Sequence, residues 1–187
     1  MRWVAVFILA YLALLAQTTL VRLVQIHGLG VGTVAPDLPA IVAVFLALHA
    51  GRAVDAMLAA WVLGLGLGLT ASGGPGGGTV LGPMAVLYAL TAGGLFRVRE
   101  AFFRDRIHAQ ALLTLAFCLL VHGAWVTAQA LRAFGYMTWP AYGEMLLQAL
   151  GISVYTAVVA PLVHWALRRG QRVLMNVSAG RGRRAGA

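Results

Sequence analysis

Residues 109–130 read AQALLTLAFCLLVHGAWVTAQA, a long apolar run that contains no charged side chain. A helix needs about 20 mostly apolar residues to cross a bilayer, so this run predicts a transmembrane helix. Five other apolar runs accompany it, and the six expected helices cover residues 3–20, 34–50, 55–71, 80–96, 109–130 and 146–167. The sequence therefore predicts an all-α integral membrane protein with a six-transmembrane-helix bundle over residues 1–169.

The composition agrees with lipid as the solvent of this chain. Hydrophobic residues make up 61% of its 187 residues and charged residues only 10%, which is unusual for a water-soluble domain. The net charge of +9 comes from arginine alone. The arginines lie in short runs between apolar stretches, and this placement favours membrane topology over nucleic-acid binding. Cys118, the single cysteine, excludes an intramolecular disulfide and a cysteine-based metal site.

The distribution of arginine predicts the orientation. If the six helices alternate in direction, Arg22 and Arg132 face one side, and the other twelve arginines share the opposite side: Arg2, Arg52, Arg97, Arg99, Arg104, Arg106, Arg168, Arg169, Arg172, Arg181, Arg183 and Arg184. Positively charged loops stay in the cytoplasm, so both termini are expected there, in a bacterial plasma membrane.

The second expected helix is short for a span unless it begins before Pro36 and Pro39. Removing it would place residues 97–106 outside, against the arginine distribution, so six spans are favoured over five. Residues 170–187 are basic and rich in glycine, and we expect a disordered cytoplasmic tail.

No constellation for catalysis, for a metal or for a cofactor is expected. All five carboxylates fall at expected helix ends or in loops: Asp37, Asp55, Glu100, Asp105 and Glu144. Ionisable groups inside a membrane are the usual functional candidates, and His122 and His164 are the candidates in this chain. Neither has a companion ligand one turn away, so hydrogen bonds to neighbouring helices are their expected role.

Gly64 and Gly68 form a G-x-x-x-G face on the third expected helix. Such a face allows close approach of another helix. Packing inside the bundle is slightly favoured, and docking of a partner's single helix remains open.

Two further segments have local interpretations. Pro36, Asp37 and Leu38 mark a helix start at which the aspartate caps free backbone N–H groups. Residues 96–107 alternate aromatic or aliphatic side chains with Arg97, Arg99, Arg104 and Arg106. This pattern is typical of an interfacial segment that contacts anionic lipid, with a cytoplasmic docking surface as the alternative.

Residues 34–100 resemble the family of the bacterial rod shape-determining protein MreD. The resemblance is carried by Pro36-Asp37-Leu38 with the apolar run to Gly51, by the glycine-leucine repeat from Gly64 to Leu69, and by the segment from Leu81-Gly82 through Tyr88, Leu90 and Gly93 to Arg97. Members of that family commonly carry an aspartate after the repeat, where this chain has Thr70-Ala71-Ser72.

The resemblance implies a non-enzymatic scaffold of the cell-elongation machinery that binds the single-span protein MreC. It also implies indirect partners: RodA, a penicillin-binding transpeptidase and MreB filaments.

The fold expected from the resemblance is similar to that of the substrate-binding subunits of energy-coupling-factor vitamin transporters. A small-molecule binding subunit is therefore the alternative function. Such a subunit needs an aromatic-lined cavity open to the outside, and the candidate lining residues are Trp125, Tyr136, Trp139, Tyr142 and Glu144. Anchoring at the membrane interface is the simpler role for these aromatic residues.

Overall fold

The computed structural model describes residues 3–26, 32–70, 82–99, 107–133 and 138–179. Within them the chain forms six long helices and one single turn: α1 (Trp3–Thr19), α2 (Val21–Val24), α3 (Leu38–His49), α4 (Ala53–Thr70), α5 (Pro83–Val98), α6 (Ile107–Arg132) and α7 (Trp139–Ala179). The all-helical architecture predicted from the sequence is confirmed.

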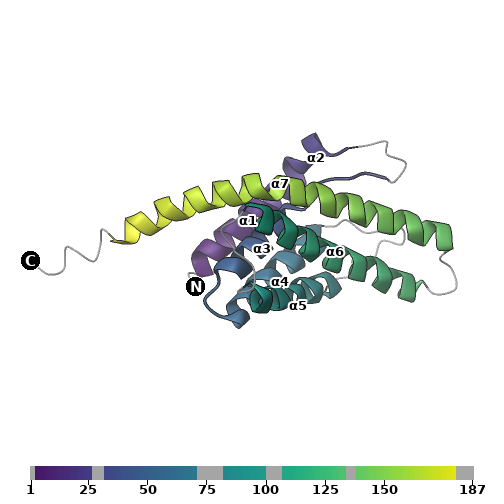
Figure 1. Ribbon diagram of the computed structural model, residues 1–187, viewed down its shortest axis with the longest axis horizontal. Helices are drawn as coiled ribbons and strands as arrows, with labels where there is room; N and C mark the ends of the chain where they lie inside the picture. The colour runs from purple at the N-terminus through teal and green to yellow at the C-terminus, as the bar shows by residue number, and fades with distance from the viewer. Residues whose placement is uncertain (1–2, 27–31, 71–81, 100–106, 134–137, 180–187) are drawn as a thin grey trace, which may run out of the picture.

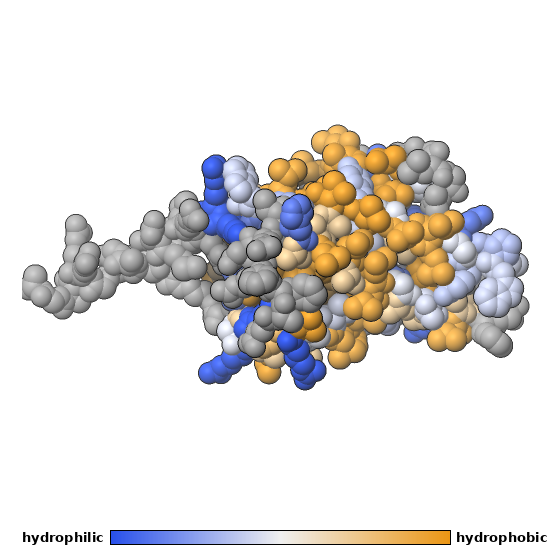
Figure 2. Space-filling view, viewed as in Figure 1, coloured by the Kyte–Doolittle hydropathy of each residue, from blue (hydrophilic) through white to orange (hydrophobic). Residues whose placement is uncertain are grey.

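The long helices run back and forth along one direction (Figure 1). The start of α1, the α3–α4 connection, the end of α5 and the end of α7 lie at one end of the bundle. We call this the N-terminal end of the bundle. The other end, where α6 stops and α7 begins, is called the opposite end. Figure 2 shows a broad apolar band across the middle of the molecule, with hydrophilic residues gathered beyond it.

Three of the described helices are long and apolar enough to cross a membrane. They are α4, residues His108–Arg132 of α6 and residues Trp139–Gly170 of α7. The other apolar helices, α1, α3 and α5, have 10–17 residues each. Membrane-spanning character therefore follows from the length and composition of α4, α6 and α7.

The short helix α3 lies at the centre of the bundle. Every side chain from Pro39 to Leu48 is buried, and α3 contacts α1, α4, α5, α6 and α7. A helix that is apolar on all sides belongs in a core. The segment that looked weakest as a span is thus the one around which the other helices pack.

Helix α3 begins later than expected, at Leu38 and not near residue 34. Asp37 is extended, with φ −92° and ψ 91°, as is usual for the residue that caps the N-terminus of a helix. Its 12 residues span about 18 Å at 1.5 Å per residue, which is shorter than the hydrocarbon core of about 30 Å. Upstream, Val34 pairs with Ile26 through two backbone hydrogen bonds of 2.8 and 3.0 Å.

Helix α7 also differs from expectation, since it begins at Trp139 and continues to Ala179. The expected end at residue 167 is wrong, and residues 170–179 of the predicted disordered tail are helical. Pro161 lies inside this helix and removes one backbone hydrogen bond. Residues 180–187 lie outside the described residues.

Candidate functional site

Five side chains from different parts of the chain meet at the start of α3. They come from α1, from the residue before α3, and from α5, α6 and α7, and we call them the Asp37 cluster: Gln17, Asp37, Tyr88, His122 and Thr156. Asp37 is only 3% exposed. The cluster therefore joins four helices to the beginning of the central one.

The cluster supplies hydrogen-bond partners for the first backbone N–H groups of α3. The first N–H groups of a helix have no partner within it, and none can remain unpaired in lipid. The N–H of Leu38 donates to Gln17 Oε1 at 2.9 Å, and that of Ala40 donates to Asp37 Oδ1 at 3.0 Å. Pro39 has no N–H to satisfy. The capping role predicted for Asp37 is confirmed, and Gln17 is a partner that the sequence did not reveal.

Helix α7 contributes the hydroxyl of Thr156 to the cluster, and this hydroxyl makes two hydrogen bonds. Thr156 Oγ1 accepts from the backbone N–H of Asp37 at 2.9 Å and donates to the Ile152 carbonyl at 2.6 Å. Eight residues earlier in α7, Gln148 Nε2 donates to the Thr33 carbonyl at 3.0 Å. The extended segment before α3 is thereby fixed along α7.

Asp37 does more than cap α3. Its Oδ2 accepts from the hydroxyl of Tyr88 at 2.7 Å and lies 3.4 Å from His122 Nε2. The other ring nitrogen of His122, Nδ1, is 3.0 Å from the Cys118 carbonyl oxygen. Asp37 lies at a helix end, as predicted, but folding places this helix end inside the bundle, so its carboxylate is buried beside Tyr88 and His122.

The two intramembrane histidines both bond to other parts of the bundle, as predicted. His122 reaches Asp37, and the fully buried His164 places Nε2 at 3.3 Å from the Ile41 carbonyl of α3. His164 Nδ1 has no hydrogen-bond partner within the described part of the chain. Of the two histidines, His122 is the one that faces a carboxylate, at 3.4 Å from Asp37 Oδ2.

A cavity of about 290 Å³ reaches the Asp37 cluster from the opposite end of the bundle. We call it the His122 cavity, and its walls come from α5, α6 and α7: Met84, His122, Trp125, Val126, Gln129, Met145, Gln148, Ala149 and Ile152. Trp125 and Gln129 also line a second hollow beside Arg132, at the end of α6. His122 therefore forms the boundary between this cavity and buried Asp37.

Of the aromatic and acidic residues predicted to line a cavity, the structure places only Trp125 there. Trp139 is 85% exposed and stacks edge-on with Tyr142, as interfacial anchors do. Glu144 is exposed, and Tyr136 lies outside the described residues.

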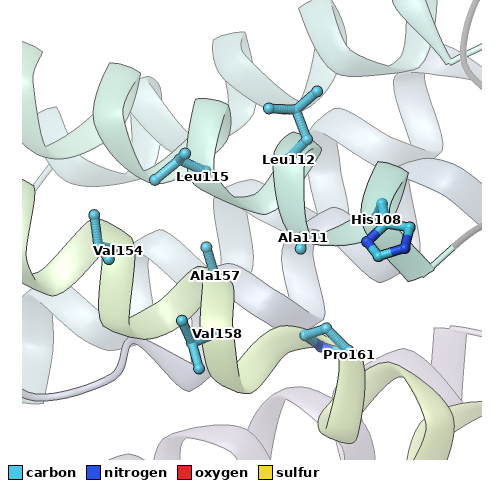
Figure 3. A pocket seen from close by; sticks show the side chains of 8 residues that line it. All are labelled: His108, Ala111, Leu112, Leu115, Val154, Ala157, Val158 and Pro161. Carbon is cyan, nitrogen blue, oxygen red and sulfur yellow. The ribbon is translucent and has the colours of Figure 1, made fainter.

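A larger apolar groove of about 430 Å³ runs between α6 and α7 (Figure 3). The side chains on its α6 side are His108, Ala111, Leu112 and Leu115, and those on its α7 side are Val154, Ala157, Val158 and Pro161. A groove of this composition accepts hydrocarbon, from lipid or from another helix.

The two glycines of the predicted packing face have different surroundings. A Cβ at Gly64 would lie 2.8 Å from the Ala85 Cα and 2.9 Å from the Tyr88 Cβ, whereas a Cβ at Gly68 would meet nothing within 4 Å. Gly64 therefore serves close packing of α4 on α5. Gly68 does not.

The arginines predicted to contact lipid or a cytoplasmic partner also differ from one another. Arg99 is half-buried and donates to the Ala50 carbonyl at 2.6 Å and to the Leu48 carbonyl at 3.4 Å, so its guanidinium bonds within the bundle, and its contact with lipid or a partner stays a prediction. It neutralises the free carbonyls at the end of α3. Arg97 is exposed, in agreement with a surface role, and Arg104 and Arg106 lie outside the described residues.

Comparisons with protein-family models, with curated proteins and with solved structures gave no match to this chain.

Proposed function

We propose that this protein is a non-enzymatic, six-span scaffold in the bacterial plasma membrane that takes part in cell elongation by binding an MreC-like single-span protein. Through that partner it contributes to the assembly of RodA, a penicillin-binding transpeptidase and MreB. The proposal starts from the resemblance of residues 34–100 to the MreD family.

The observation that supports it most is that the residues carrying this resemblance contact one another in space. Asp37 bonds to Tyr88, and Gly64 lies against the Cβ of the same tyrosine. A Cβ at Gly93 would lie 3.0 Å from the side chain of Met57 on α4. Residues that are distant in sequence thus form one packing unit of α3, α4 and α5, as expected if they are signatures of a shared fold.

The arrangement of helix ends is consistent with the proposed orientation. Arg52, Arg97, Arg99, Arg168 and Arg169 belong to segments at the N-terminal end of the bundle (Figure 1). Arg132 ends α6 at the opposite end. With the arginine-rich end in the cytoplasm and in contact with anionic lipid, both termini are cytoplasmic and the His122 cavity opens to the outside.

The direct test is a mild-detergent pull-down of the tagged, full-length protein from its native membranes, followed by mass spectrometry. Recovery of a single-span MreC-like protein together with RodA or its transpeptidase supports the scaffold. Recovery of neither, under conditions that preserve other membrane complexes, contradicts it.

One observation favours the alternative, a small-molecule binding subunit of a membrane transporter. The His122 cavity has the tryptophan and polar side chains that such a site requires, in Trp125, Gln129 and Gln148. The same pull-down decides between the two functions, because a binding subunit would co-purify with transporter ATPases and their membrane coupling subunit.

A further inference from the structure

We propose that Asp37 and His122 form a proton-binding site inside the membrane, in which His122 is an imidazolium paired with the Asp37 carboxylate and is reached by solvent through the His122 cavity. The ligand is a proton, and its binding links α6 to the start of α3.

The hydrogen bonds around His122 fix where protons must lie. A carbonyl oxygen can only accept, so the 3.0 Å contact with the Cys118 carbonyl requires a proton on Nδ1. The other nitrogen, Nε2, faces Asp37 Oδ2 at 3.4 Å. A lone pair on Nε2 directed at a carboxylate oxygen would be repulsive. One further proton must therefore lie between Nε2 and Oδ2.

The surroundings of Asp37 place this proton on the histidine. Oδ1 accepts the N–H of Ala40 in the first turn of α3, and Oδ2 accepts the hydroxyl of Tyr88. Both donors, together with the positive end of the α3 dipole, stabilise the ionised carboxylate. A carboxylate paired with an imidazolium is neutral as a unit, and pairing of this kind is what permits charges to remain within a membrane.

Among the described residues, no third charged side chain bonds to Asp37 or His122. Helix α5 contributes the hydroxyl of Tyr88, and α6 contributes the thiol of Cys118. Thr156 from α7 and Gln17 from α1 are uncharged. The proton therefore belongs to the Asp37–His122 pair.

The His122 cavity gives the pair a route for exchanging its proton with water. The side chain of His122 is 12% exposed and that of Asp37 is 5% exposed, and His122 lines the cavity while Asp37 does not. Protons thus arrive at His122 from the end of the bundle at which the cavity opens. When the proton leaves, the lone pair of His122 Nε2 repels the Asp37 carboxylate. The attraction between α6 and the start of α3 is then lost.

The charge of His122 is measured by nuclear magnetic resonance of ¹⁵N-histidine-labelled, full-length protein in lipid nanodiscs. The signal missing in His122→Gln identifies this residue. We expect both ring nitrogens of His122 to carry protons at about pH 7.5 in the wild type, and only one to do so in Asp37→Asn. Tyr88→Phe weakens the cluster but leaves the carboxylate, so there His122 stays doubly protonated.

A singly protonated His122 in the wild type overturns the proposal, because the shared proton would then lie on Asp37 or be absent. Persistence of both protons in Asp37→Asn overturns it as well. If Asp37→Asn does not fold, the wild-type measurement alone decides.

Access through the cavity is tested with diethyl pyrocarbonate, which acylates a ring nitrogen that carries no proton. We expect His122 to react several-fold faster in Asp37→Asn than in the wild type, and the reaction to slow again when Gln129→Trp narrows the cavity. His108, exposed in the first turn of α6, is the control that reacts alike in all variants. An unreactive His122 in Asp37→Asn contradicts the proposed route.

Discussion

At the scale of single residues, Asp37 connects more elements of the bundle than its place in the sequence indicates. Its carboxylate caps α3, accepts the hydroxyl of Tyr88 and faces His122, while its backbone N–H bonds to Thr156. Each bond satisfies a group that would be costly to leave unpaired in lipid. A residue that looks like an ordinary helix cap in the sequence is therefore the meeting point of α3, α5, α6 and α7.

Replacing Tyr88 with phenylalanine removes one buried hydrogen bond to a charged group. We expect Tyr88→Phe to lower the free energy of unfolding by about 1.5–3 kcal/mol, measured by denaturant titration in detergent micelles. Tyr155→Phe is the matched control, since Tyr155 loses only an exposed hydrogen bond of 3.0 Å to the Val24 carbonyl. Equal losses in the two variants would show that the bond to Asp37 adds nothing particular.

At the scale of helices, the contacts between elements depend on how closely backbones approach. Helices α4 and α5 touch at Gly64, where no side chain fits against Ala85. Helix α3 ends against Arg99, whose guanidinium stacks 3.8 Å above the Phe96 ring while it bonds to the α3 carbonyls. Gly64 thus joins α4 to α5 by close backbone contact, whereas Arg99 joins the end of α5 to the end of α3 by hydrogen bonds.

The two glycines of α4 give a prediction about this packing. Gly64→Leu is expected to lower the free energy of unfolding by about 1–3 kcal/mol or more, because its side chain must push α5 away. Gly68→Leu, with open space around its Cβ position, is expected to change stability by less than about 1 kcal/mol. Thermal unfolding in detergent compares them, and similar losses in both would contradict the close contact at Gly64.

Gly68→Leu is also a probe of partner binding, because it leaves the bundle intact. If the partner helix packs on this face of α4, recovery of the MreC-like protein falls in the pull-down while thermal stability is unchanged. If the MreC-like protein is fully recovered with Gly68→Leu, its helix does not pack on this face of α4.

At the scale of the whole molecule, the short length of the central helix α3 explains why polar groups lie inside the bundle. Helix α3 is too short to cross the bilayer alone, and the segment before it runs extended beside α7, tied there by Gln148 and Thr156. A polar helix start is consequently buried well inside the bundle. The Asp37 cluster and the His122 cavity both follow from this arrangement.

Membrane orientation gives a prediction at the same scale. Arg97, Arg104 and Arg106 can be changed to glutamate without touching Arg99, which is needed inside. Because positive loops are retained in the cytoplasm, we expect the triple variant to place a reporter in the α5–α6 connection outside in a measurable fraction of molecules. A reporter that remains wholly inside would contradict the role of these arginines, and Arg132→Glu, at the opposite end of α6, is the control.

The sequence alone determined the helical class and the approximate positions of the long helices, because apolar runs of sufficient length have few other solutions in lipid. It also determined that Asp37 caps a helix, since capping depends on residues three positions apart. These are local properties of the chain, and they can be read without knowing what lies beside each helix.

Only the tertiary structure decided what the local signals meant. Asp37, Tyr88, His122 and Thr156 are separated by 34 residues or more, and no periodicity links them. The same holds for the inward turn of Arg99 and for the difference between Gly64 and Gly68. A helix end buried against four other helices acquires partners from all of them, and that burial is set by how the whole chain packs around α3.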